Sequence, residues 1–208
     1  MRIVAISDTH CKLKQISIPD GDVLIHAGDA TMGGRYSEVL EFATSMIHLP
    51  HKHKIFVAGN HDLGFQDEPE KFEQLLRDAG IVYLKDSYTL IDQIKFYGSP
   101  WQPEFYNWAF NLPRGPALGA VWSKIPADTD VLITHGPPKD ILDYVSRGER
   151  VGCDELLSAV IEKKPKYHIF GHIHEGYGVL ERYGVMFCNV AICNRRYEPV
   201  NAPYVFDL

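Results

Sequence analysis

The chain begins RIVAISDTH over residues 2–10, an apolar run that ends in the polar triplet Asp8-Thr9-His10. The run over residues 2–7 is rich in Val and Ile and has the length of a buried strand. In open α/β sheets, functional sites gather at the carboxyl ends of the strands. This stretch therefore predicts a sheet and also the edge of that sheet at which polar side chains collect.

Other apolar runs along the chain end in the same way. They lead into Gly28-Asp29, Gly59-Asn60-His61-Asp62, Thr134-His135-Gly136 and Gly171-His172-Ile173-His174. These clusters supply carboxylate, amide and imidazole groups, which are common ligands of divalent metals. A single Asp-x-His motif is more often a turn or a satisfied polar pair than a metal site. Five polar clusters, each at the end of a predicted strand, together predict a two-metal hydrolase site.

Strand-like runs alternate with helical patterns in the early part of the chain. The predicted strands cover residues 2–7, 22–26, 54–58, 88–91, 94–98, 130–134, 167–170, 177–181, 185–189 and 204–206. Apolar residues at helical spacing predict helices over residues 37–47, 69–79 and 154–163. The C-terminal third is strand after strand. This mixture implies an α/β fold of two stacked sheets flanked by helices, in one domain over residues 1–208.

The composition excludes several classes of protein. Hydrophobic residues make up 45% and charged residues 23% of the chain, which is ordinary for a globular protein. The formal net charge is -6, and Lys and Arg are scattered, so we expect no duplex nucleic acid as a partner. No stretch has the length of a membrane span. A small anionic substrate held by metals fits this composition better.

The cysteines and the first residues indicate the compartment. Cys11, Cys153, Cys188 and Cys193 are widely spaced and form no C-x-x-C pair, which favours free thiols in a reducing compartment. The first apolar run is too short for a secretory signal. We therefore expect a cytoplasmic location and no association with a membrane.

The spacing of the polar residues suits a pair of metal ions. Two divalent ions about 3.5–4 Å apart can lower the pKa of a water molecule and clamp a phosphoryl group, and such a pair needs a bridging carboxylate. Asp29 is the natural bridge, because it ends the second strand beside the first. Asp8 and His10 are two residues apart on extended backbone and point to the same side, as do His172 and His174.

The clusters, taken in their order along the chain, resemble the calcineurin-like metallophosphoesterase superfamily. GSPWQP (residues 98–103), FNLPRG (residues 110–115), residues 171–178 and the ending FDL (residues 206–208) are similar to its metallophosphoesterase-domain-containing (MPPED, brain protein 239-like) branch. The resemblance covers essentially the whole chain. It implies a four-layer α/β/β/α sandwich of two mixed sheets flanked by helices.

The resemblance also implies a complete set of metal ligands. The first ion takes Asp8, His10, Asp29 and His174, and the second takes Asp29, Asn60, His135 and His172. This set of oxygen and imidazole ligands suits Mn, Fe or Zn, among which we favour Mn. His61 is left free of metal to stabilise the transition state or protonate the departing alkoxide, and Asp62 is expected to orient it. His26 and His168 fit packed histidines better than ligands.

Two segments are candidates for contacts with the substrate. Residues 99–121 carry several aromatic residues and an arginine between Pro and Gly breaks. Trp101 is expected to stack on a nucleobase, and Arg114 to bind phosphate. The alternative is that this segment simply covers a sheet edge. Residues 195–199 either form a wall of the site or only connect strands, and the sequence does not distinguish these two roles.

The sequence thus favours a metal-dependent phosphodiesterase acting on small phosphodiesters such as cyclic nucleotides, a substrate preference that rests on the branch resemblance. A phosphomonoesterase, acting on phosphoproteins among other substrates, is the alternative enzyme. Phosphoprotein phosphatases of this superfamily carry Asp-Arg-Gly after their Gly-Asp block and Glu after Asn-His, whereas this chain has Met32-Gly33-Gly34 and Asp62. A binding module on the same fold is the non-enzymatic alternative. The sequence leaves the natural substrate and the oligomeric state open.

Overall fold

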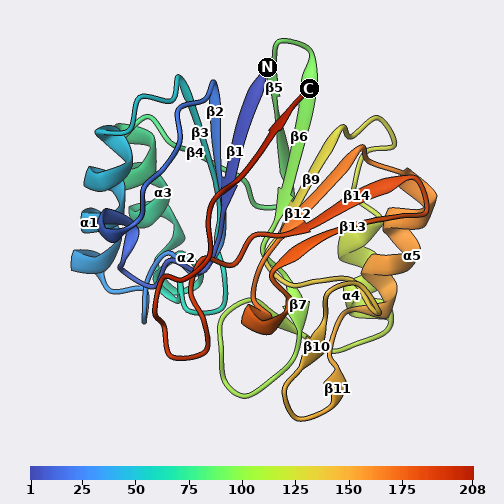
Figure 1. Cartoon of the computed structure of the whole chain (residues 1–208). Coiled ribbons are helices and arrows are strands. Elements are labelled where there is room, and N and C mark those ends of the chain that lie inside the picture. The colour runs from blue at the N-terminus through green and yellow to red at the C-terminus, as the bar shows by residue number, and fades with distance from the viewer.

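Two β-sheets stand face to face in the computed structural model, which describes residues 1–208 (Figure 1). The first sheet has the strand order β15-β1-β2-β3-β4. Strands β1 to β4 run parallel to one another, and the C-terminal β15 pairs with β1 in the antiparallel sense. Its strands are β1 (Arg2–Ile6), β2 (Val23–Ala27), β3 (His53–Val57), β4 (Val82–Tyr83) and β15 (Tyr204–Asp207).

The second sheet has the strand order β13-β14-β12-β9-β6-β5. Its four central strands are parallel, whereas the edge strands β13 and β5 are antiparallel to their neighbours. Its strands are β5 (Ser87–Ile91), β6 (Ile94–Ser99), β9 (Val131–Thr134), β12 (Tyr167–Phe170), β13 (Gly178–Arg182) and β14 (Val185–Asn189). Both sheets are therefore mixed, as we expected.

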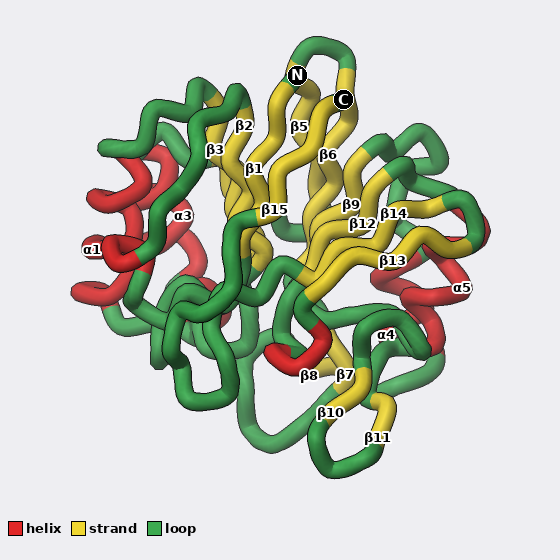
Figure 2. Tube along the Cα trace, viewed as in Figure 1, coloured by secondary structure: helices red, strands yellow, loops and turns green.

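Helices cover the outer face of each sheet (Figure 2). Helices α1 (Tyr36–Ile47) and α3 (Pro69–Asp78) flank the first sheet, and α4 (Pro116–Trp122) and α5 (Asp154–Lys163) flank the second. The shorter elements are η1 (Leu13–Gln15), α2 (Gly64–Asp67), η2 (His174–Gly176), the ribbon of β7 (Gln102–Pro103) with β8 (Asn111–Leu112), and the hairpin of β10 (Tyr144–Val145) with β11 (Glu149–Arg150).

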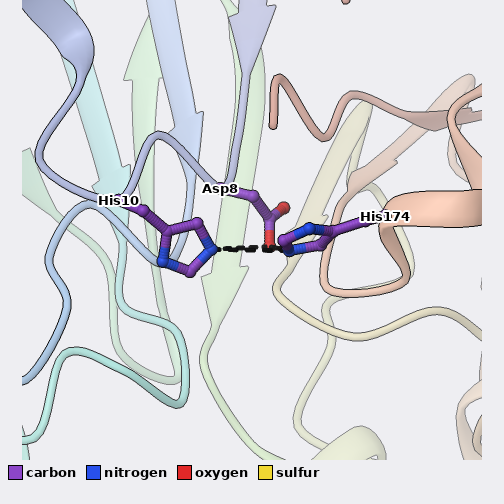
Figure 3. A group of neighbouring side chains, drawn as sticks. All are labelled: Asp8, His10 and His174. Atoms are coloured by element: carbon purple, nitrogen blue, oxygen red, sulfur yellow. Dashed lines mark hydrogen bonds and ion pairs between the residues drawn. The ribbon is translucent and has the colours of Figure 1, made fainter. Parts of the chain in front are cut away.

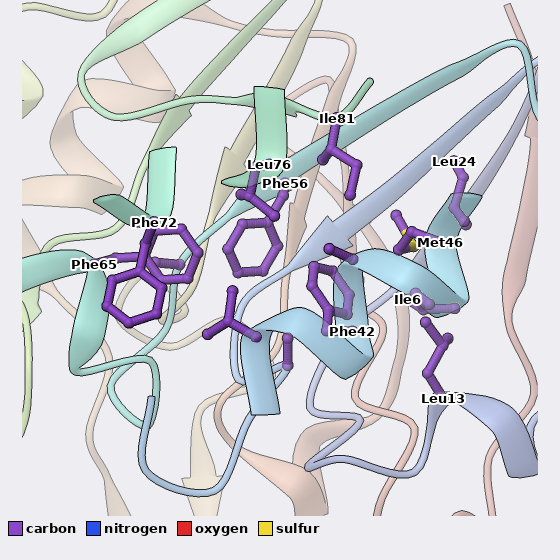
Figure 4. Packing of buried hydrophobic residues seen from close by; sticks show 14 of the residues in the cluster. Ile6, Leu13, Leu24, Phe42, Met46, Phe56, Phe65, Phe72, Leu76 and Ile81 are labelled. Atoms are coloured by element: carbon purple, nitrogen blue, oxygen red, sulfur yellow. The ribbon is translucent and has the colours of Figure 1, made fainter. Parts of the chain in front are cut away.

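Three apolar layers hold the four structural layers together. Residues such as Ile25, Val57 and Ile133 fill the space between the sheets. Phe42, Phe56 and other aromatic and aliphatic residues fill the space between the first sheet and its helices (Figure 4). A third cluster joins α4 and α5 to the second sheet. The α/β/β/α sandwich predicted from the sequence is confirmed.

Every strand and helix predicted from the sequence is present, and each end lies within one residue of its predicted position. The prediction omitted the short elements β4, α2 and α4 and the two small ribbons. All four cysteines are free thiols, with Cys11 exposed and the others buried. No helix has both the length and the apolar character needed to cross a membrane.

Candidate metal centre

The predicted ligands lie where the carboxyl ends of the two sheets meet. Asp8 and His10 follow β1, Asp29 follows β2 and Asn60 follows β3 in the first sheet. The second sheet supplies histidines after β9 and β12: His135, His172 and His174. The backbone N–H of His172 donates to Asp8 Oδ2 at 2.9 Å and so ties the two sheets together at this point.

One group of ligand atoms is formed by Asp8, His10 and His174 (Figure 3). His174 Nε2 lies 3.2 Å from Asp8 Oδ1 and 3.4 Å from His10 Nε2. The Nδ1–H of His174 donates to the carbonyl oxygen of Asn194 at 2.8 Å. That hydrogen bond leaves the lone pair of Nε2 directed into the group, as a metal ligand requires.

A second group is formed by Asp29, His135 and His172. His135 Nε2 lies 3.4 Å from Asp29 Oδ1 and 2.9 Å from Asn60 Oδ1, which brings Asn60 into the same group. The Nδ1–H of His135 donates to the carbonyl oxygen of Ala27 at 3.0 Å, so its Nε2 also presents a lone pair.

Asp29 lies between the two groups. Its Oδ1 faces His135, whereas its Oδ2 is 3.9 Å from His10 Nε2. The residues fit a pair of divalent ions, because imidazole nitrogens and carboxylate oxygens converge around two centres that share one carboxylate. The structure thus brings together all of the ligands expected from the sequence: Asp8, His10, Asp29, Asn60, His135, His172 and His174.

Opposite charges hold the centre together in the absence of metal. Burial raises the pKa values of Asp8 and Asp29, but the hydrogen bond from His174 and the charge of His135 outweigh it, so both carboxyl groups titrate well below their usual range. Burial lowers the pKa values of His135 and His174, but the two carboxylates raise each of them to about 9. At neutral pH the Nε2 atom of each of these histidines therefore carries a proton, and its lone pair becomes free for a metal ion only when that proton leaves.

The backbone at these strand ends is strained. Asp8, His10, Asp29 and His172 have φ angles of 54°, 43°, 56° and 67°, a region that non-glycine residues rarely occupy. Such strain gathers at functional sites, where the surrounding structure enforces it. Gly171, in the last motif, is needed for a steric reason and not for its backbone conformation. A Cβ atom at this position would collide with the Asp8 carboxylate.

Comparison with known proteins identifies this centre. The sequence model of the family "Calcineurin-like phosphoesterase" matches residues 1–176. The chain belongs to the calcineurin-like phosphoesterase family. Together with the metal-ligand groups, this membership makes the chain a metal-dependent phosphoesterase, and its family resemblance is confirmed.

A relative supports this assignment to the calcineurin-like phosphoesterases, and solved structures share the fold. "Metallophosphoesterase domain-containing protein 1" of Homo sapiens is 45% identical over 232 residues, which cover 100% of this chain and 71% of the human protein. The Thermus thermophilus protein TT1561 shares the fold, with a TM-score of 0.60 at 17% identity over 90% of this chain and 88% of that one. A structure described as a novel archaeal phosphodiesterase has a TM-score of 0.55 at 18% identity, covering 100% of this chain and 93% of that one.

His61 of this phosphoesterase forms a further group of possible ligand atoms with His10 and Asp29. Its Nε2 is 4.0 Å from Asp29 Oδ2, and its Nδ1–H donates to the carbonyl oxygen of Met32 at 2.9 Å. The ring of Trp108 packs on the His61 imidazole with a centroid separation of 4.2 Å. These contacts direct Nε2 toward the space above the ligands.

The expectation that Asp62 orients His61 is wrong. Asp62 is fully buried beneath the loops, and its oxygens accept hydrogen bonds from the backbone N–H groups of Asp29, Thr31 and Gly59 at 2.9, 3.0 and 2.8 Å. It makes no contact with the His61 ring, whose orientation is set by the Met32 carbonyl. Both residues belong to a turn over residues 59–62, in which the N–H of Asp62 donates to the carbonyl oxygen of Gly59 at 3.1 Å.

A cavity of about 400 Å³ opens over the ligands of this phosphoesterase. Its walls include the aromatic residues Phe105, Tyr106, Trp108 and Tyr197 and the charged residues Arg147, Glu175 and Arg195. Tyr197 also packs on the His10 ring, with a centroid separation of 4.5 Å. Residues 195–199 therefore contribute a wall of the site, a role that the sequence left undecided.

The two side chains proposed from the sequence as substrate contacts do not line this cavity. The indole N–H of Trp101 donates to Asp86 at 3.1 Å. Arg114 donates to the carbonyl oxygens of Val151 and Gly152 at 2.7 and 2.8 Å. Trp108, which lies in the same aromatic segment, lines the cavity and packs on His61. The sequence pattern does not distinguish it from the other aromatic residues of that segment.

Proposed function

We propose that this phosphoesterase hydrolyses small phosphodiesters, cyclic nucleotides among them, with Mn²⁺ as the preferred ion. The observation that carries the proposal is the cavity of about 400 Å³ above the ligands, which has room for organic groups on a phosphate. Aromatic rings form much of its wall and suit the flat or apolar parts of such esters. The preference for cyclic nucleotides rests on the branch resemblance.

The charges in the cavity favour a diester over a monoester. A phosphodiester carries one negative charge, whereas a monoester carries nearly two at neutral pH. The arginines at the cavity already have partners, because Arg147 pairs with Glu149 at 2.7 Å and Arg195 pairs with Glu175 at 3.5 Å. No other Lys or Arg lines the cavity. The second charge of a monoester therefore lacks an unpaired cation outside the metal centre.

The reaction consumes one water molecule. Two divalent ions, when bound, neutralise phosphoryl charge and lower the pKa of the attacking water. The water oxygen gives up one proton to solvent and forms a bond to phosphorus, and the bond to the leaving oxygen breaks. The products are a phosphomonoester and an alcohol, which stay joined in one molecule when the diester is cyclic. His61 Nε2 donates a proton to the departing oxygen, while the Met32 carbonyl holds the ring through Nδ1–H. Asp62 fixes the loop that carries Asp29.

The test compares hydrolysis of bis(p-nitrophenyl) phosphate with that of the monoester p-nitrophenyl phosphate. Protein freed of metal is reconstituted with Mn, Fe or Zn, and metal content is measured alongside turnover. We expect wild type with Mn to hydrolyse the diester with the higher kcat/KM. His61→Ala should lose about 10²–10⁴-fold in kcat while retaining metal, and Asp29→Ala should lose bound metal.

A matched control is His48→Ala, because His48 is exposed and lies outside the cavity. Its turnover should equal that of wild type. A higher kcat/KM for the monoester would establish the phosphomonoesterase alternative instead, and phosphopeptides would then be tested. Bound metal without turnover of either ester would indicate a binding module.

A further inference from the structure

A second cavity adjoins the one above the metal centre. It has a volume of about 290 Å³ and lies between the loop after β6 and the β10–β11 hairpin, which stand at the same end of the molecule (Figure 1). The two cavities share His172 and five further residues: Phe105, Tyr106, Val145, Arg147 and Ile173. They are therefore continuous along the predicted ligand His172.

One part of the second cavity is apolar. Its apolar walls are formed by Pro103, Phe105, Tyr106, Val145, Val151 and Ile173. Phe105 packs edge-on against His172 with a centroid separation of 5.2 Å, so the apolar wall begins at the metal centre. The side chain of Tyr106 is 82% exposed, although it lines both cavities. Packing of such an exposed aromatic ring on an apolar group of a ligand is favourable, because it removes apolar surface from water.

The charged side chains that line this cavity are Glu104, Arg114 and Arg147. The exposed Glu104 carboxylate disfavours a further negative charge on the bound group, and both arginines already have partners. Arg114 is held by the carbonyl oxygens of Val151 and Gly152, and Arg147 is paired with Glu149.

We infer that the second cavity is a subsite for one of the two organic groups of a phosphodiester, an uncharged aryl or alkyl group. The inference rests on the proposed phosphodiesterase function and specifies its substrate class. An open-chain diester with two separate organic groups occupies both cavities, with its phosphate at the metal centre between them.

The position of His61 distinguishes the two subsites. His61 and Trp108 line the first cavity and not the second. The leaving oxygen needs the proton of His61, so the leaving group lies in the first cavity. The retained group, which stays bonded to phosphorus, lies in the second cavity beside Val151.

The test varies the retained group while keeping the leaving group constant. The substrates are methyl p-nitrophenyl phosphate and phenyl p-nitrophenyl phosphate, whose common leaving group is p-nitrophenol. Wild type should show a kcat/KM at least tenfold higher for the phenyl ester. Val151→Trp fills the subsite and should reduce this phenyl-to-methyl ratio to about one. The matched control Val179→Trp lies on the exposed strand β13 and should leave the ratio unchanged.

A binding measurement separates the subsite from catalysis. Diphenylphosphinate and methylphenylphosphinate cannot be hydrolysed, and their Kd values are obtained by titration calorimetry on the Mn-loaded protein. Diphenylphosphinate should bind wild type about tenfold more tightly, and Val151→Trp should remove this difference. Equal ratios for wild type and Val151→Trp in both measurements would overturn the inference. Turnover of neither ester by wild type would instead count against the proposed function, while the phosphinate titration would still report on the subsite.

Discussion

At the scale of single residues, Asp62 shows how a motif side chain serves the site without facing the substrate. Its carboxylate accepts hydrogen bonds from four backbone N–H groups of the loops that carry Asp29 and Asn60, and from the hydroxyl of Thr31 at 2.8 Å. The hydrogen bonds fix the loop after β2 against the loop after β3. Asp62 therefore positions the bridging carboxylate of Asp29.

Asp62→Asn should destabilise the protein. The amide retains one acceptor oxygen and places an NH₂ group against backbone donors, and each unsatisfied buried group costs about 1–3 kcal/mol. We expect the free energy of unfolding to fall by about 2–4 kcal/mol in urea denaturation, with or without metal. The control Asp67→Asn changes an exposed residue and should leave the free energy of unfolding at the wild-type value. Unchanged stability, with loss of turnover, would instead assign Asp62 to the reaction itself.

Gly171 leaves room for a metal ligand. A Cβ atom there would overlap the Asp8 carboxylate and the Ser7 hydroxyl. Because both neighbours are fully buried, neither can move aside cheaply. The glycine of the Gly-His-x-His motif is thus part of the metal centre, although it has no side chain.

Gly171→Ala should therefore weaken metal binding. Displacement of Asp8 removes one ligand of the first ion, and we expect at least a tenfold loss of affinity for that ion by titration calorimetry. Gly119→Ala is the matched control, because a Cβ atom at Gly119 meets no atom within 4 Å. Normal metal content and affinity in Gly171→Ala would show that Asp8 is not a ligand.

At the scale of elements, β2 and β12 each carry a buried histidine behind the ligands. His26 Nε2 lies 2.8 Å from the hydroxyl oxygen of Thr9, and His168 Nε2 lies 2.9 Å from that of Thr134. These threonines are the neighbours of His10 and His135 in the sequence. Each sheet thus supports one ligand-bearing turn through a histidine of an adjacent strand.

These strands should make the protein sensitive to acid. Burial lowers the pKa of His168 to about 3, so between pH 6.5 and 3 the unfolded chain binds a proton that the native state excludes. Stability is then lost as the pH falls, by about 2 kcal/mol from pH 7 to pH 5 for one such histidine. Urea denaturation should show that His168→Gln lacks this part of the decline, whereas the exposed His48→Gln keeps it. Parallel curves for wild type and His168→Gln would contradict the prediction.

The elements that were predictable from the sequence are those long enough to show a pattern. Strands such as β12 and β14 are apolar runs bounded by turns, and their bounds were predicted without error. The omitted β4 has two residues and α2 has four, which is too short for periodicity to emerge. The omitted α4 has seven residues and lies in an aromatic segment, where Leu118, Val121 and Trp122 simply contribute to the core.

The candidate site was predictable where side-chain chemistry is specific. Histidine and carboxylate residues at strand ends can be recognised as metal ligands from their residue type, and the structure places them together. The partner of His61 is a backbone carbonyl, which any residue has, so no sequence signal singles out Met32. The choice of Trp108 over Trp101 depends on how residues 99–111 turn, because both have the same chemistry.

At the scale of the whole molecule, the metal centre is formed by residues from both sheets. The first sheet contributes Asp8, His10, Asp29 and Asn60, and the second contributes His135, His172 and His174. The apolar layer between the sheets brings these ligands within reach of one another. Each proposed ion has ligands from both sheets, so it binds only when the sheets are packed.

Metal loading should therefore stabilise the whole fold. Ions that bind only the native state add about 2.7 kcal/mol at a free concentration of 100 times Kd, which corresponds to a rise in Tm of about 5–10 °C for a chain of 208 residues. The rise should be larger at pH 8 than at pH 6, because the ions compete with protons on His135 and His174, whose pKa values are about 9 without metal. Calorimetric scans with Mn²⁺ and after chelation measure the effect, and His135→Ala should reduce it. A Tm unchanged by bound Mn²⁺ would mean that the ions do not join the sheets.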